Sequence, residues 1–216
     1  MVAMLPGWSA TINLANPVSD SVTVDGVNWK YDSLVTSTTT ADSSANGYTG
    51  NLDALTGSLP SLATGVNLAG TSGYSNGMNF VSGAGVGNPR VYANMGVTNN
   101  LAMVATDFTG GSWIKFASID TGVNQTIIIM DRGGYNTTAG VGAGHYAFTL
   151  YKNTSDNWQL GFQSGDGVTN STGQTTLSNW NLQDGSWHHL GYNFDYNAAS
   201  DNVVTFWLDG VDVGSA

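Results

Sequence analysis

The sequence predicts an all-β fold, a sandwich of two antiparallel sheets. Short runs of alternating apolar and polar residues follow one another along most of the chain, as in strands with one buried face. Tight-turn dipeptides separate several of these runs, among them Asp184-Gly185 and Asp209-Gly210. Strong helix formers are scarce, because the 15 acidic residues are all Asp and only 5 residues are Lys or Arg.

The alternating runs supply both the predicted strands and the predicted core. Hydrophobic residues make up 41% of the chain and include 7 Trp, 9 Tyr and 7 Phe, enough to fill one large domain. Three tryptophans within the runs, Trp113, Trp187 and Trp207, are expected in the core. In chain order the runs lie at 21–32, 77–81, 90–96, 112–119, 125–131, 145–151, 158–162, 187–196 and 203–210.

The chain divides into a short opening segment and one large domain. Residues 1–21 are predicted to be an N-terminal arm or an edge strand, because Ala10 to Leu14 alternates and Asn16-Pro17 then ends the run. Residues 22–216 form the predicted sandwich domain. Within it, residues 36–76 are rich in Thr, Ser and Gly and are expected to be long packed loops.

The charge balance argues against two classes of partner. The formal net charge is −10, and no cluster of basic residues offsets it locally, so binding to nucleic acid is not expected. The longest strongly apolar stretch, Ile127 to Met130, is far too short to span a membrane. Isolated Asp residues in loops suit solubility or divalent cations instead.

Six segments of the chain resemble the LamG-like jelly-roll family, a branch of the concanavalin A-like lectin/glucanase superfamily. The more specific part is the pair DGSWHHLGYNFDY (184–196) and VTFWLDGVDVG (204–214). GSWIKFAS (111–118) is similar to the strand that carries the family's tryptophan. The opening WKYD (29–32), followed by DSSANGYTGNL (42–52), and the glycine-bounded strand at 70–85 also fit the pattern.

The resemblance implies a jelly-roll sandwich that binds carbohydrate or glycoprotein outside the cell or at its surface. It also implies a further strand that returns beside the first one, whereas this chain ends at Ala216. The sandwich is therefore expected to lack its final strand, or to have that position filled by another chain or by residues 1–20. An unfilled edge position would allow strand exchange between copies, since sheet edges accept added strands.

An enzyme is not expected. Glycoside hydrolases of this superfamily act through a pair of glutamates, and the chain contains no Glu. His188 and His189 are adjacent on a predicted strand, so they point to opposite faces and cannot share one metal ion. We interpret them as one core residue and one solvent-facing imidazole.

The loop at 42–52 contains candidate ligands for a calcium ion. Asp42, Ser43 and Asn46 offer oxygen ligands of the kind that calcium prefers, and the family resemblance strengthens this hypothesis. The same side chains also suit hydrogen bonds to their own backbone, so both interpretations stay open.

Two aromatic residues near predicted loops are candidates for sugar binding. Sugar rings stack on aromatic faces, and neighbouring Asn or Asp side chains bind their hydroxyls. Trp158 with Asn157, and Tyr135 with Asp131, have this combination. The alternative is that these rings are buried in the core.

The sequence thus predicts a non-catalytic extracellular carbohydrate-binding or adhesion module whose partner is a glycan or a glycoprotein surface. The alternative is a structural subunit of an extracellular filament, sheath or viral particle, which assembles with copies of itself through strand exchange. Low charge density, the missing strand and the N-terminal segment motivate the second hypothesis.

Overall fold

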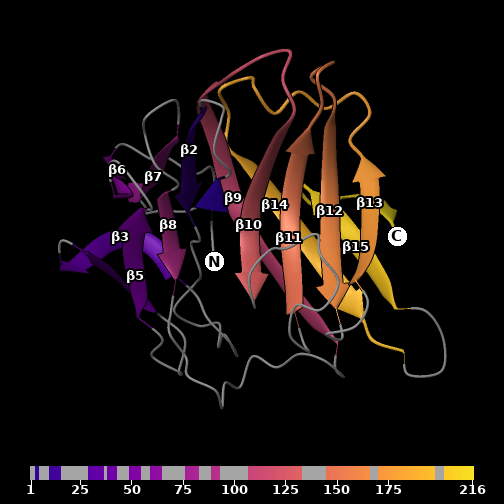
Figure 1. Cartoon of the computed structure of the whole chain (residues 1–216), viewed down its shortest axis with the longest axis horizontal. Helices are drawn as coiled ribbons and strands as arrows, with labels where there is room; N and C mark the ends of the chain where they lie inside the picture. The colour runs from indigo at the N-terminus through magenta and orange to yellow at the C-terminus, as the bar shows by residue number, and fades with distance from the viewer. Residues whose placement is uncertain are drawn as a thin grey trace.

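The structure is a computed structural model, and the part that it describes is all-β. The described residues are 3–4, 10–15, 29–36, 38–42, 49–54, 59–64, 76–82, 89–92, 107–132, 145–165, 170–197 and 202–216. They form 16 strands in three antiparallel sheets (Figure 1). Within these ranges there is no helix with the length and apolar character to cross a membrane.

The first large sheet has five strands, all antiparallel. Four of them stand side by side at the front of Figure 1. In spatial order the strands are β1 (Ala3–Met4), β10 (Gln125–Arg132), β11 (His145–Lys152), β12 (Trp158–Gly165) and β13 (Asn170–Thr176).

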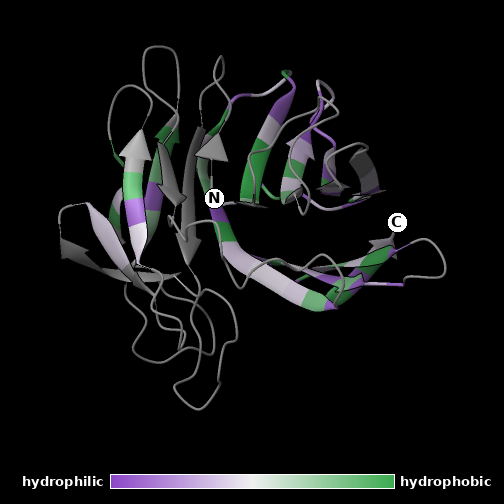
Figure 2. Ribbon diagram, turned by 60° about the horizontal axis from the view of Figure 1, so that its bottom comes forward, coloured by the Kyte–Doolittle hydropathy of each residue, from purple (hydrophilic) through white to green (hydrophobic). Residues whose placement is uncertain are grey.

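The second large sheet has seven strands, and part of it lies behind the first sheet in Figure 1. Figure 2, turned from that view, shows the two layers one above the other. In spatial order the strands are β16 (Val211–Ser215), β15 (Val203–Leu208), β14 (His188–Asp195), β9 (Phe108–Ile119), β2 (Ala10–Ala15), β7 (Asn76–Ser82) and β6 (Ser61–Thr64).

A third sheet of four strands lies at the opposite side of the molecule from β13 (Figure 1). It contains β3 (Trp29–Thr36), β4 (Thr39–Asp42), β5 (Gly50–Ala54) and β8 (Pro89–Tyr92). Three strands, β4, β5 and β6, fall within residues 36–76, so the expectation of long loops there is wrong. Their short length and few large apolar residues explain why no alternating run marks them.

The core fills the space between the two large sheets, and the predicted alternation accounts for it. Along β15, Val204, Phe206 and Leu208 are buried while Val203 and Trp207 are exposed. Buried rings from the two sheets meet across this space. The ring pairs that cross it are Phe148–Tyr192 at 4.8 Å, Phe162–Phe194 at 5.3 Å and Phe116–Trp158 at 4.9 Å between centroids. The prediction of an all-β antiparallel sandwich is confirmed.

The opening segment contributes to both large sheets. β1 lies at the edge of the five-stranded sheet, where it pairs with β10. β2 lies inside the seven-stranded sheet, with β7 on one side and β9 on the other. Residues 10–15 are therefore not an edge strand, because hydrogen bonds occupy both of their sides.

The outer edge of β16 is covered by the other sheet. The Thr175 hydroxyl of β13 donates a hydrogen bond of 2.9 Å to the backbone carbonyl of Val213. The Asp212 carboxylate accepts one of 2.8 Å from the backbone N–H of Gly214. A register shift between β15 and β16 bends the strand here, and Gly214 has a φ of 121°. The Thr175–Val213 hydrogen bond joins the two sheets, whereas the Asp212–Gly214 hydrogen bond lies within β16 and satisfies one of its backbone N–H groups.

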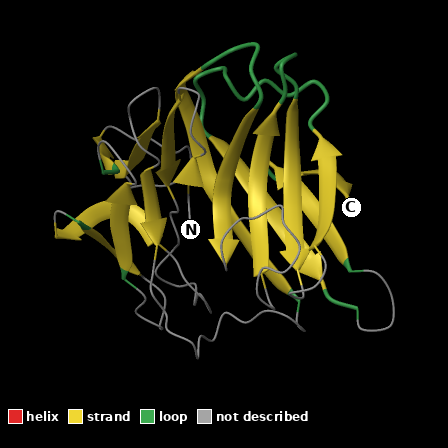
Figure 3. Ribbon diagram, in the orientation of Figure 1, coloured by secondary structure: helices red, strands yellow, loops and turns green. Residues whose placement is uncertain are grey.

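Four connections lie at one end of the sandwich, which we call the loop end. They are residues 120–124, 153–157, 177–187 and 209–210, which join β9 to β10, β11 to β12, β13 to β14 and β15 to β16. The first three include the loops drawn in green at the top of Figure 3. Asp156 and Asp209 have positive φ angles of 58° and 51°, as tight turns require.

Candidate functional site

The outer face of the seven-stranded sheet carries large side chains that the core does not use. Side chains alternate between the two faces of a strand, so the residues between buried ones point away from the other sheet. On β9 the outward residue beside buried Ser112 and Ile114 is Trp113, which is half-buried. On β15 it is Trp207, which keeps 38% of its surface exposed.

Trp113 and the half-buried His189 form a cross-strand pair on this face. The two residues are direct partners in the register of β9 and β14. Their ring centroids are 5.3 Å apart, with an angle of 57° between the planes. The indole and the imidazole therefore pack against each other outside the core.

Glycines allow the His189 ring to lie low on the sheet. Gly111 and Gly191 are partners in adjacent strands, and Gly191 is also the partner of Trp207. A Cβ atom at Gly111 would lie 3.2 Å from Nε2 of His189, and one at Gly191 would lie 3.5 Å from its Cε1. The Cβ atom of Trp207 is 3.7 Å from the place that a Cβ atom at Gly191 would occupy. A side chain at position 111 would therefore crowd the imidazole and the Leu190 carbonyl, which would be 2.6 Å from its Cβ, whereas a methyl group at position 191 would make only ordinary contacts.

A row of polar residues crosses the same face next to the glycines. Thr109, Asn193 and Thr205 are partners across β9, β14 and β15. The Asn193 amide donates a hydrogen bond of 3.2 Å to the Asp195 carboxylate. We call the outward residues Trp113, His189 and Trp207, together with this row, the outer platform.

The electrostatic setting keeps His189 neutral near pH 7. Burial lowers the pKa of its imidazole, and the nearby Asp209 carboxylate opposes this effect more weakly. Asp209 also accepts a 2.7 Å hydrogen bond from the backbone N–H of His189. The outer platform therefore presents two indoles and an uncharged imidazole at neutral pH.

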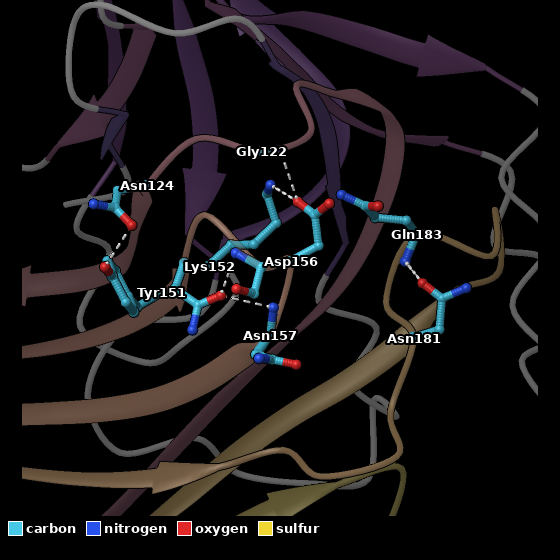
Figure 4. A network of polar contacts seen from close by, with 10 residues as sticks. Gly122, Asn124, Tyr151, Lys152, Asp156, Asn157, Asn181 and Gln183 are labelled. Carbon is cyan, nitrogen blue, oxygen red and sulfur yellow. Dashed lines mark hydrogen bonds and ion pairs between the residues drawn. The ribbon is translucent and has the colours of Figure 1, made fainter.

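A second polar group of residues lies at the loop end (Figure 4). The buried Lys152 ammonium forms an ion pair with Asp156, which also accepts a 3.1 Å hydrogen bond from the backbone N–H of Gly122. These two donors lower the pKa of the Asp156 carboxyl. Nearby, the Tyr151 hydroxyl donates a 2.9 Å hydrogen bond to the Asn124 side chain.

One side chain in this group has no hydrogen-bond partner. Gln125 is 1% exposed, and neither its amide oxygen nor its amide nitrogen is bonded. It is the cross-strand partner of Lys152. The Gln183 amide nitrogen is also buried without a partner, and Figure 4 shows this side chain pointing toward Asp156. The loop-end contacts mainly tie three loops together, which is a structural role.

His188 is held on the inner face by two carboxylates. Its Nδ1 lies 2.8 Å from Asp209 and its Nε2 lies 3.1 Å from Asp184. The Asp184 carboxyl has a lowered pKa, first because the backbone N–H of Ser186 donates to it and then because of His188. The prediction that His188 and His189 point to opposite faces, one of them buried, is confirmed.

The structure describes three of the four predicted sugar-binding residues, and it changes the interpretation of one of them. Trp158 is 2% exposed and packs on Phe116, so it offers no free face to a sugar, and its role as a stacking residue is corrected to a core role. Asn157 is exposed at the loop end, where its backbone N–H donates to the Asn153 side chain. Asp131 lies in β10, and Tyr135 lies outside the described residues.

The predicted calcium ligands are largely outside the described part of the chain. Asp42 is the last residue of β4, whereas Ser43 and Asn46 are not described. Among the described residues, no group of three or more His, Asp, Glu or Cys side chains is placed to hold a metal ion. Calcium binding at Asp42, Ser43 and Asn46 stays a prediction.

The expectation that Trp113, Trp187 and Trp207 belong to the core is wrong. None of the three is part of the buried cluster, and Trp187 is half-buried just before β14. The signal was present in the sequence: the alternation that buries Ile114 and Phe206 turns Trp113 and Trp207 outward. Outward glycines next to them were the second clue.

The structure is thus an antiparallel β-sandwich that carries aromatic side chains on the outer face of one sheet. Comparison of the chain with family models, with curated proteins and with solved structures returns no match. The resemblance to the LamG-like family therefore stays a prediction, and the functional argument depends on the site.

Proposed function

We propose that the protein is a non-catalytic carbohydrate-binding module, and that the outer platform is its binding surface. The observation that carries the proposal is the grouping of Trp113, His189 and Trp207 on adjacent strands of one exposed sheet face. In keeping with the sequence analysis, the proposed partner is a glycan or glycoprotein outside the cell or at its surface.

The chemistry of the outer platform supports this proposal. The C–H faces of a sugar ring pack well against indole rings, and the 38% exposure of Trp207 leaves part of its ring free. Thr109, Asn193 and Thr205 provide hydroxyl and amide groups that both donate and accept hydrogen bonds. Sugar hydroxyls need both functions.

Rigidity of the supporting strands is a further argument. β9, β14 and β15 are paired along their length, and their inner faces are buried in the core. Side chains on such strands keep their relative positions, so binding orders few groups and loses little entropy.

The test is glycan binding by alanine variants of the outer platform. Trp207→Ala and Trp113→Ala should each weaken binding to the best polysaccharide ligand by roughly two- to tenfold, the effect of about 0.5–1.5 kcal/mol for an aromatic contact. The readout is affinity electrophoresis in polysaccharide gels, followed by titration calorimetry.

Val203→Ala is the matched control. Val203 is exposed on β15, as Trp207 is, and it lies on the same face four residues away. Binding should be unchanged in this variant. If the two tryptophan variants bind as the unchanged protein does, or if no glycan binds at all, the proposal is wrong.

Assembly through strand exchange remains the alternative function. The exposed apolar residues Val203, Trp207 and Val211 on β15 and β16 are the feature that favours contacts between copies. At the edge of β16 the Val213 carbonyl already accepts a hydrogen bond from Thr175, which makes this carbonyl less available to an added strand. Analytical ultracentrifugation distinguishes the two: concentration-dependent growth that Val211→Asp abolishes would favour assembly.

A further inference from the structure

We infer that the ligand is an uncharged, linear oligosaccharide that lies across the strands and covers several sugar residues. This inference rests on the proposed function and concerns the same outer platform. It excludes two other ligand classes, monosaccharides and acidic glycans. Three features of the described residues lead to it.

The first feature is the direction in which the platform residues are arranged. Gly111, Gly191, Trp207 and Asp212 are successive partners across β9, β14, β15 and β16. Adjacent strands are about 4.8 Å apart, so this row spans roughly 14 Å. The two indoles stand on either side of His189 on different strands. A single sugar ring cannot contact both indoles and Asp212, whereas a chain across the strands can.

The second feature is the polar row that runs parallel to the first. Thr109, Asn193 and Thr205 cross the same three strands at the next outward position. An oligosaccharide on the aromatic residues therefore has hydrogen-bonding groups along one side over its whole length. A binding surface for a chain end would instead place its polar groups around one point.

The third feature is the charge of the surface around Trp207. Asp212 is exposed and is the direct partner of Trp207. Asp195 is exposed farther along the same face, where it is the partner of Val203 and accepts a hydrogen bond from Asn193. The chain as a whole has a formal net charge of −10. An acidic sugar at Trp207 would face the Asp212 carboxylate at close range.

One cation lies on the same face, farther from this acidic part. Lys115 is two residues beyond Trp113 along β9, on the side away from the polar row. It is half-buried and separated from Trp207 by the Trp113–His189 pair. Lys115 therefore does not offset the Asp212 carboxylate beside Trp207, and the acidic surface favours neutral chains.

The first experiment varies ligand length. Titration calorimetry of the whole protein uses neutral gluco-, manno- and xylo-oligosaccharides of one to six residues, chosen from the series whose polysaccharide binds best. Affinity should rise with length, with the six-residue ligand binding at least about tenfold more tightly than the monosaccharide, and should then level off. A monosaccharide that binds as tightly as the longer ligands overturns the inference.

The second experiment varies charge. Polygalacturonate fragments of matched length should bind more weakly than the neutral series. Asp212→Asn keeps an oxygen that can accept the Gly214 hydrogen bond but removes the charge, so it should raise affinity for the acidic fragments about two- to fivefold. Asp120→Asn, an equal change of charge at the exposed loop end, is the control and should leave affinity unchanged.

The outcomes separate this inference from the proposed function. Binding that depends on Trp207 but prefers acidic fragments, or that is independent of length, overturns the inference and leaves the proposed function intact. Failure of every neutral and acidic ligand to bind overturns both.

Discussion

At the scale of single residues, glycines decide which side chains can approach one another. Gly110 and Gly111 are adjacent in β9 and point to opposite faces of the sheet. A Cβ atom at Gly110 would lie 2.3 Å from the Tyr192 hydroxyl oxygen and 2.7 Å from two of its ring carbons. The Tyr192 ring is buried, and its hydroxyl donates a 3.2 Å hydrogen bond to the sulfur of Met130. Movement of the ring would break this hydrogen bond and disturb the packing around it.

Substitution of two glycines by alanine should therefore have different effects. Gly110→Ala should lower the free energy of unfolding by about 1–3 kcal/mol, because the new methyl group overlaps the Tyr192 ring. Gly191→Ala should be neutral or raise it by about 0.4–1 kcal/mol, because its methyl group makes ordinary contacts and the unfolded chain loses freedom. Urea unfolding measures both, and equal losses in the two variants would contradict the structure.

At the scale of the elements, the described edge strands are the least predictable from sequence. β13 has the sequence NSTGQTT, without an apolar alternation. It is nevertheless a strand because β12 pairs along its whole length. Its Gly173 allows Ala216 to approach, since a Cβ there would lie 2.8 Å from the Ala216 Cβ. Pairing and close packing, not local preference, make this segment a strand.

The contact between β13 and β16 predicts how a substitution in β16 changes the stability of the protein. Gly214→Ala should lower the free energy of unfolding by about 1–3 kcal/mol, because φ is 121° there and few residues other than glycine adopt this conformation. The added methyl group would also lie 2.8 Å from the Thr175 hydroxyl. Thermal unfolding followed by circular dichroism gives the change in stability.

Gly122→Ala is a useful comparison for the edge variant. Gly122 also has a positive φ, 67°, but open space surrounds its Cβ position. Gly122→Ala should therefore lower the free energy of unfolding by less than Gly214→Ala does. An equal or greater loss in Gly122→Ala would show that the β13–β16 contact adds nothing to stability.

At the scale of the whole molecule, His189 and two carboxyl groups, Asp156 and Asp184, contribute to how stability changes with pH. Burial lowers the pKa of His189, so the unfolded chain, with a histidine pKa near about 6.5, takes up a proton first as pH falls. Stability therefore decreases as pH falls from about 6.5 to the lower pKa of folded His189. Asp156 and Asp184, with lowered pKa values, lose their contribution only at more acidic pH, below about 3.8.

The predicted decrease in stability at lower pH can be assigned to His189 with a variant that lacks this imidazole. The unchanged protein should lose stability between pH 7.5 and pH 5.5, and His189→Gln should lose less over the same interval, because Gln has no proton to gain. The other two histidines are present in both proteins, so the difference reports His189. Urea unfolding at the two pH values provides the data. A larger loss in the variant would show that the sign is wrong.

Part of the site could also be predicted from the sequence, and part could not. The sequence alternation predicts that Trp113 and Trp207 point outward, because their neighbours Ile114 and Phe206 are apolar residues that point to the core. Their grouping with His189 could not be predicted, because it depends on the register between strands that are about 75 and 18 residues apart in the chain. Trp158 shows the reverse error: its Asn and Asp neighbours suggest exposure, yet the opposite sheet covers its ring.

The sequence by itself determined the class of fold and most of the strands that build the core. Alternation, turn dipeptides and the lack of helix formers are local properties, and each one acts wherever the segment lies in space. The tertiary structure decided which strands are neighbours, that β2 lies inside a sheet, and that two tryptophans and a histidine meet on an outer face. These features depend on pairing between distant segments, and the packing of two sheets selects that pairing.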